Sequence, residues 1–223
     1  MIPKFKTIQE QAEFLKGGNK GLRERLPVCK SKKALKAVPD NEYLSLMSLR
    51  VFRAGLKHSM VDARWPDFNK VFFNFDIDSV RGMSDEALEK LMNDIRIIRH
   101  LGKIKSVRAN AAAIYELCSD YGSIGTYLAE WPVTDIVDLW TDLKNRFSQL
   151  GGNSGPYFLR MAGKDTFILT KHVVSALNNW KIYEGEPRSM KAHKKIQDVF
   201  NQWMEESELP LCQLSMILAM SVD

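Results

Sequence analysis

LGGNSGPYFLRMAGKDTFILT, which covers residues 150–170, is the stretch that decides the fold of this chain. A leucine, a glycine-rich turn and a fresh apolar segment predict two helices joined by a tight hairpin. Glycine backbone can approach a phosphate closely, and the amides that begin the second helix would point at the phosphate oxygens with the positive end of the helix dipole. The pattern indicates a hairpin that grips nucleic acid without reading its sequence, although an ordinary helix–turn–helix corner would look the same.

Helical periodicity continues on both sides of this hairpin, and strand-like alternation is nearly absent. Asp40 stands where a helix N-cap belongs, as does either Asp78 or Ser84 further along, and Trp65-Pro66 begins another helix. The expected helices cover residues 40–56, 65–75, 84–94, 102–117, 126–131, 133–147, 172–180, 191–204 and 211–220. Together with the second hairpin helix they make roughly ten helices, which predicts an all-α fold.

Length and composition are typical of a globular protein. The 223 residues are 45% hydrophobic, enough for a sizeable core. No run approaches the ~18 apolar residues of a membrane span, and the first residues lack the apolar core and cleavage site of a signal peptide. We therefore expect a cytoplasmic protein without a membrane partner. The three cysteines are widely spaced and form no metal-binding or disulfide pattern.

Positive charge is concentrated at the start of the chain. Residues 1–39 carry a net charge of +7, whereas the whole chain carries +5. We expect residues 1–39 to form a basic N-terminal arm and residues 40–223 to form the helical domain. Such an arm suits a polyanion, and a solvated basic face with no partner is an equally valid interpretation.

Residues 54–117 resemble the central region of bacterial 3-methyladenine DNA glycosylase I proteins. The most specific motifs are AGL at 54–56, FD at 75–76, IIRH at 97–100, GKI at 102–104 and NA at 110–111. The hairpin stands where that family has its helix-hairpin-helix, and residues 200–222 resemble the tail of one proteobacterial branch. The resemblance implies the helix-hairpin-helix DNA glycosylase fold, with two helical lobes flanking a cleft. It begins near Asp40 and leaves the basic arm unexplained.

A glycosylase must flip the damaged base out of the stack, at a cost on the order of a few kcal/mol, and fill the gap it leaves. The resemblance implies that Gly55 and Leu56 form this DNA wedge, although an ordinary core leucine would look the same. Phosphate contacts would come from Lys57, from the hairpin and from two following cations. The implied hairpin and cationic contacts are Gly152, Asn153, Ser154, Gly155, Arg160 and Lys164.

The implied base pocket departs from the family. Arg50 replaces the glutamate that contacts the methylated purine, and His58 replaces a tryptophan. A guanidinium within ~4 Å repels a cationic base by about 1–4 kcal/mol, depending on screening. Aromatic side chains expected to line the pocket with them are Tyr43, Phe52 and Trp65, although aromatic residues at helical spacing are more often core.

The catalytic residue is not identified by the sequence. The wider superfamily places an aspartate where this chain has Thr170, although the 3-methyladenine branch also lacks it. Weak candidates are His58, Asp62, which lies one helical turn later and could orient the imidazole, and Asp165, which could equally cap a turn. The hairpin has no lysine where lyase-type relatives place a Schiff-base nucleophile, so strand cleavage is not expected.

The zinc site of the family is not expected here. Zinc needs about four cysteine or histidine ligands, and only His172 stands in register, because Ala176 occupies the cysteine position. We therefore predict no metal and no cofactor, although a monovalent or divalent ion could still bridge the hairpin to phosphate.

These observations predict a monofunctional DNA glycosylase of base excision repair, with 3-methyladenine as the default lesion. The expected partner is double-stranded DNA with damaged or abasic sites, and the expected state is a monomer. A non-catalytic or altered-substrate protein that binds damaged DNA with the same fold is the alternative, which Arg50 favours. A third hypothesis is an unrelated helical scaffold whose arm binds RNA or an acidic protein.

Overall fold

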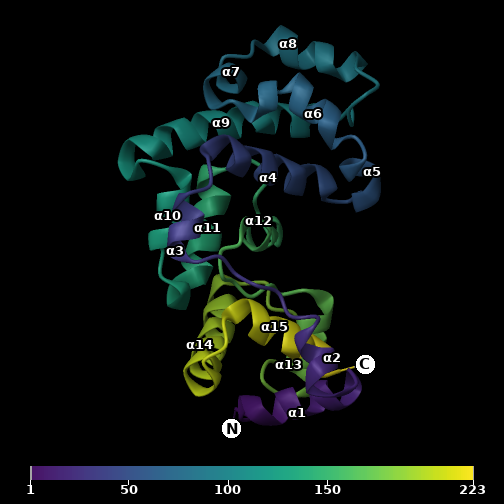
Figure 1. Cartoon of the computed structure of the whole chain (residues 1–223), viewed down its shortest axis with the longest axis vertical. Helices are drawn as coiled ribbons and strands as arrows, with labels where there is room; N and C mark the ends of the chain where they lie inside the picture. The colour runs from purple at the N-terminus through teal and green to yellow at the C-terminus, as the bar shows by residue number, and fades with distance from the viewer. Residues whose placement is uncertain (1, 223) are drawn as a thin grey trace. The chain divides into compact units, whose positions relative to one another are not determined.

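The computed structural model describes residues 2–222, and these residues form helices and no strand, which confirms the all-α class (Figure 1). The α-helices are α1 (Phe5–Leu15), α2 (Gly18–Arg23), α3 (Lys32–Lys36), α4 (Asp40–Arg53), α5 (His58–Asp62), α6 (Trp65–Val71), α7 (Ile77–Arg81), α8 (Asp85–Lys90), α9 (Leu101–Tyr121), α10 (Ile124–Glu130), α11 (Ile136–Arg146), α12 (Ser154–Ala162), α13 (Lys171–Asn179), α14 (Met190–Ser207) and α15 (Leu211–Met220). Short 3-10 turns are η1 (Phe73–Phe75), η2 (Leu91–Asn93) and η3 (Val133–Asp135). Across the described residues, no helix has both the length and the apolar character that crossing a bilayer requires.

The chain forms two compact units. Unit 1 contains the residues up to Lys30, Trp131–Leu139 and the residues from Gly163 onward, and unit 2 contains Ser31–Glu130 and Trp140–Ala162. The division at residues 39 and 40 that the charge pattern predicts falls inside unit 2. Residues 1–39 are therefore divided between the two units and include three helices, α1 to α3.

Unit 1 joins the two ends of the chain. Helix α1 packs on α14 and α15 and buries Phe5, Ile8 and Ala12. The Phe5 and Trp203 rings lie 5.4 Å apart, and the Trp203 indole N–H donates to the Pro3 carbonyl at 3.1 Å. The basic arm is folded because α1 has an apolar face, which net charge alone does not reveal.

Unit 2 is built around α4. This helix packs on α9 and α12, with smaller contacts to α10 and η1. An aromatic cluster of Phe52, Trp65, Phe68, Phe72 and Phe75 fills the space between α4, α6 and η1. Phe68 is central, because its ring centroid lies 4.5 Å from that of Phe52 and 4.8 Å from that of Trp65. The cluster packs α4 against α6 and η1.

The aromatic cluster predicts a large difference between two phenylalanines of unit 2. Phe68→Ala should lower the free energy of unfolding by about 3–5 kcal/mol, because it leaves a cavity among packed rings. Phe73→Ala is the control, since Phe73 is 53% exposed, and it should change stability by less than ~0.5 kcal/mol. Urea unfolding followed by circular dichroism measures both, and equal effects would contradict the central position of Phe68.

Candidate nucleic-acid-binding site

The hairpin lies in unit 2, between the end of α11 and the start of α12. Gly152 has a φ of 57° and Gln149 a φ of 66°, so the turn twice enters the left-handed region. The Gly155 amide donates to the Leu150 carbonyl at 3.1 Å, and a Cβ on Gly155 would lie 3.1 Å from the same oxygen. Glycine is favoured there because any Cβ would crowd the Leu150 carbonyl across the turn.

This closure changes the predicted phosphate contacts. Gly155 is buried and its amide is used inside the turn, so its predicted phosphate contact is wrong. The Ser154 amide similarly donates to the Gly151 carbonyl at 3.2 Å. Gly152 and Asn153 are exposed, and their phosphate contacts stay predictions. The hairpin therefore offers its tip, residues 151–153, rather than the first turn of α12.

Of the two cations that follow the hairpin in sequence, the structure contradicts the predicted role of one. Lys164 is only 3% exposed, and its Nζ donates to the Trp131 carbonyl at 2.5 Å. Its predicted phosphate contact is wrong, because the ammonium is committed to backbone inside unit 1. Arg160 is half-buried on α12 and its role stays a prediction.

Lys144 is a cation near the hairpin that sequence reasoning missed. It is exposed in the last turn of α11, and its Cγ lies 3.7 Å from where a Cβ on Gly151 would stand. A lysine in a last helical turn is usually explained by the helix dipole, and its proximity to the hairpin tip depends on how the turn folds back.

The predicted DNA wedge occupies the loop between α4 and α5. Gly55 has a φ of 76° and no atom within 4 Å of its would-be Cβ, so the loop is open on that side. Leu56 is half-buried and Lys57 is exposed. The loop is anchored by Lys103 of α9, whose Nζ donates to the Ala54 carbonyl at 2.7 Å. Wedge and phosphate roles here remain predictions.

Arg50 extends from α4 toward α12, where its guanidinium carbon lies 4.6 Å from the centroid of the Tyr157 ring. Its Nε is buried and has no hydrogen-bond partner among the described residues. Burial lowers the pKa of Arg50, with a smaller contribution from Arg53 and an opposing one from Tyr157. Burial, followed by the charge of Arg50, likewise lowers the pKa of Lys103. The end of α4 is therefore a positively charged place in which a bound group with acceptor atoms would be stabilised.

Two of the aromatic residues predicted to line the pocket are core residues. Tyr43 is 0% exposed and donates its hydroxyl to the Leu35 carbonyl at 2.8 Å. Burial, with the nearby carboxylates of Asp40 and Glu42, raises the pKa of Tyr43 to about 12. Phe52 is also fully buried. Their prediction as pocket residues is wrong, because periodicity identifies an apolar face and not what covers it.

Trp65 is also committed to packing. Its ring stacks on Phe68 at 4.8 Å and on Phe75 at 5.5 Å, and its indole N–H donates to the Ser45 hydroxyl at 3.2 Å. The side chain is half-buried. The structure therefore gives Trp65 a role in the aromatic cluster and does not support its stacking on a flipped base.

The candidate catalytic carboxylates are structural. Asp62 pairs with Arg53 at 2.7 Å rather than with His58, so the predicted orientation of the imidazole by Asp62 is wrong. His58 is exposed at the start of α5. Asp165 accepts from the Leu211 and Cys212 amides at 3.0 and 2.8 Å, which makes it the cap of α15.

Residues after the hairpin do not fit the zinc site of the family. His172 is exposed on α13, and Ala176 is buried one turn later with no ligand atom to offer. Thr170 caps α13 by accepting from the Val173 amide at 3.2 Å. No step of the chemistry is therefore assigned to a zinc ion at this place.

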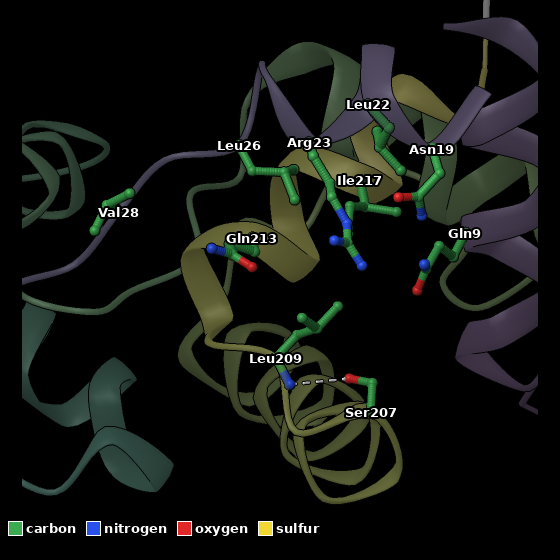
Figure 2. A pocket seen from close by; sticks show the side chains of 10 residues that line it. All are labelled: Gln9, Asn19, Leu22, Arg23, Leu26, Val28, Ser207, Leu209, Gln213 and Ile217. Atoms are coloured by element: carbon green, nitrogen blue, oxygen red, sulfur yellow. Dashed lines mark hydrogen bonds between the residues drawn. The ribbon is translucent and has the colours of Figure 1, made fainter. Parts of the chain in front are cut away.

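Unit 1 contains a separate cavity of about 460 Å³ that sequence reasoning missed. Figure 2 shows Arg23 extending into it from α2, with Gln9 of α1 and Leu209 and Gln213 around it. These residues come from both ends of the chain, so no local pattern could have found the cavity.

The described residues combine helices with a closed glycine hairpin between α11 and α12, which defines a helix-hairpin-helix fold. The family model for methyladenine glycosylases matches residues 34–149, over half of the chain, and the chain belongs to this family. This confirms the resemblance found in residues 54–117.

Individual relatives are similar to the chain in sequence or in fold. The chain is 35% identical over 83 residues to DNA-3-methyladenine glycosylase 1 of Escherichia coli K12, a match that spans 36% of this chain and 44% of that protein. The 3-methyladenine DNA glycosylase I of Staphylococcus aureus has a TM-score of 0.51 at 19% identity, over 70% of this chain and 90% of that one. The 8-oxoguanine DNA glycosylase of Methanocaldococcus jannaschii has a TM-score of 0.54 at 17% identity, over 94% and 90%. The two structural similarities show the fold.

The core position of Tyr43 predicts a stability effect. Tyr43→Phe removes the hydroxyl that satisfies the buried Leu35 carbonyl, so the free energy of unfolding should fall by about 1–3 kcal/mol. Tyr115→Phe is the control, because Tyr115 is 49% exposed and keeps its ring beneath Arg81. Urea unfolding of both variants tests whether the Tyr43 hydroxyl is held by the buried Leu35 carbonyl. An unchanged urea midpoint for Tyr43→Phe would contradict this core role of Tyr43.

Proposed function

We propose that this chain is a DNA glycosylase of base excision repair, which hydrolyses the N-glycosidic bond of a damaged purine in double-stranded DNA. The observation that carries the proposal is the closed hairpin with its exposed tip at residues 151–153, in a chain that belongs to the methyladenine glycosylase family. The protein acts as a monomer in the cytoplasm, and its hydrolytic step needs no cofactor.

Binding begins at the backbone of DNA. The hairpin tip and Lys144 hold phosphate without reading sequence. The Gly55–Leu56 loop then fills the gap that the flipped base leaves, at a cost on the order of a few kcal/mol that is smallest for damaged pairs. Lys103 makes this possible by keeping the end of α4 and the start of the loop in one place.

The charge of Arg50 bears on which base is accepted. 3-Methyladenine, the default lesion, is cationic in the nucleotide, and a guanidinium ~4 Å away opposes it by about 1–4 kcal/mol. The same guanidinium can donate to a carbonyl oxygen or ring nitrogen, and it would stabilise negative charge on a neutral base as it leaves. Arg50 therefore weakens recognition of the default lesion and favours damaged purines with acceptor edges.

A second candidate is a protein that binds damaged DNA without cutting it. The observation that favours it is that both candidate catalytic carboxylates have other partners: Asp62 is paired with Arg53, and Asp165 caps α15. Thr170, at the position of the superfamily aspartate, caps α13 and carries no charge. Base release separates the two candidates.

Base release from duplex DNA at low salt is the decisive measurement. We expect the native chain to release a damaged purine and Asn153→Asp to slow the release about tenfold, since the added carboxylate faces a phosphate. Asn145→Asp is the control, because Asn145 is exposed on α11 and takes the same change of charge. Arg50→Glu should raise the release of 3-methyladenine relative to the native chain.

The outcomes are distinct. Tight binding of abasic DNA without any base release, lost in Asn153→Asp and kept in Asn145→Asp, would contradict the glycosylase and support the non-catalytic protein. Failure of the native chain to prefer abasic duplex over RNA would contradict both candidates. Substrates with methylated and with oxidised purines should be compared side by side.

The salt dependence of DNA binding tests the cation assignments. Lys144→Met should lower the slope of log K against log salt by about 0.9, because one phosphate contact is lost. Lys164→Met should leave that slope unchanged and lower the free energy of unfolding by about 1–3 kcal/mol, since the Trp131 carbonyl loses its buried donor. An equal slope change in both variants would contradict the structural role of Lys164.

A further inference from the structure

Cys29, Asp165 and Cys212 meet in unit 1. Their two sulfurs and a carboxylate oxygen all lie within 4.8 Å of one another. Cys29 belongs to the segment between α2 and α3, Asp165 to the loop after α12, and Cys212 to the first turn of α15. Cys212 is buried, and the other two side chains are half-buried. The cluster is separate from the hairpin, which belongs to unit 2.

Hydrogen bonds beside each of these residues hold the three segments in register. The Lys30 amide donates to the Gly163 carbonyl at 2.8 Å, which ties the segment of Cys29 to that of Asp165. The Gln213 side chain donates to the Pro27 carbonyl at 3.1 Å, which ties α15 to the segment of Cys29. A ligand set held in this way loses little entropy when an ion binds.

The carboxylate of Asp165 itself connects its loop to the start of α15. Asp165 accepts from the Leu211 and Cys212 amides, so it stands at the positive end of α15. Each carboxylate oxygen has a second lone pair that remains for an ion. Two thiolates and a carboxylate with a divalent ion leave one net negative charge, which the first turn of α15 stabilises.

We propose that Cys29, Asp165 and Cys212 bind one Zn²⁺ ion. Each thiol gives its proton to solvent as its sulfur binds the ion, and a water molecule completes the tetrahedron. Thiolate ligands favour zinc over magnesium or calcium, which prefer oxygen. The ion clamps the segment after α2 to the first turn of α15, and it takes no part in base hydrolysis.

This site uses none of the positions of the zinc site that the family resemblance implies after the hairpin. Those positions hold His172 and Ala176 on α13. The clamp joins the N-terminal segment to α15, and both lie outside residues 34–149, which the family model matches. The inference does not depend on the proposed function.

Cobalt titration of the reduced, metal-free full chain tests the site. One equivalent of Co²⁺ should give a thiolate-to-cobalt charge-transfer band, and Zn²⁺ should displace it and raise the urea midpoint. Cys29→Ser should lose the band and the midpoint shift. Cys118→Ser is the matched control and should keep both, because Cys118 lies in unit 2, where its thiol donates to Asp40.

A second readout needs no variant. In the native chain, Zn²⁺ should slow alkylation of Cys29 and Cys212 and leave Cys118 unprotected, as mass spectrometry of peptides would report. No cobalt band, or a band that survives in Cys29→Ser, would overturn the site. The mass of the unreduced native chain gives one more outcome. A mass lower by two hydrogens, with a peptide that joins Cys29 to Cys212, would show a disulfide and would overturn the metal site.

Discussion

The ammonium of Lys103 is the contact that determines the geometry at the end of α4. It leaves the face of α9 and donates to the Phe52 and Ala54 carbonyls, at 3.3 and 2.7 Å. These carbonyls belong to the last turn of α4, where no helical amide remains to satisfy them. Because the bonds join α9 to the end of α4, they fix the starting point of the Gly55 loop and the position of Arg50.

This contact also explains how two cations tolerate each other at one helix end. Burial and the charge of Arg50 both lower the pKa of Lys103, so the arrangement costs free energy. The carbonyls and the negative end of the helix dipole offset part of that cost. Arg53 pairs with Asp62, whereas the guanidinium of Arg50 lies over the ring of Tyr157 and is in no ion pair among the described residues. Of the three, Arg50 is the cation whose charge remains for a ligand.

Local patterns predicted the elements, and long-range contacts decided the site. Helix α4 and the hairpin follow from periodicity and glycine, which act over a few residues. The prediction that Asp40 caps α4 is wrong, because Asp40 is the first residue of the helix and accepts from the Ile124 amide at 3.0 Å. The burial of Tyr43 depends on Leu35, and the burial of Lys164 depends on Trp131. A periodic pattern shows which side chains share the apolar face of a helix. It does not show whether a pocket or another helix covers that face. The predicted phosphate contact of Lys164 and the pocket role of Tyr43 failed for this reason.

Asp165 is a second case in which a long-range contact, invisible in the local sequence, decides the role of a side chain. In sequence it is the acid nearest to Thr170, which makes it resemble a catalytic group. In the structure both of its oxygens accept amides at the start of α15. A helix that begins at Leu211 after a proline has no side-chain cap of its own, so its amides need an acceptor from elsewhere in the chain. Closing unit 1 from both ends of the chain therefore uses the carboxylate of Asp165 as the cap of α15, a role that no local pattern around residue 165 could reveal.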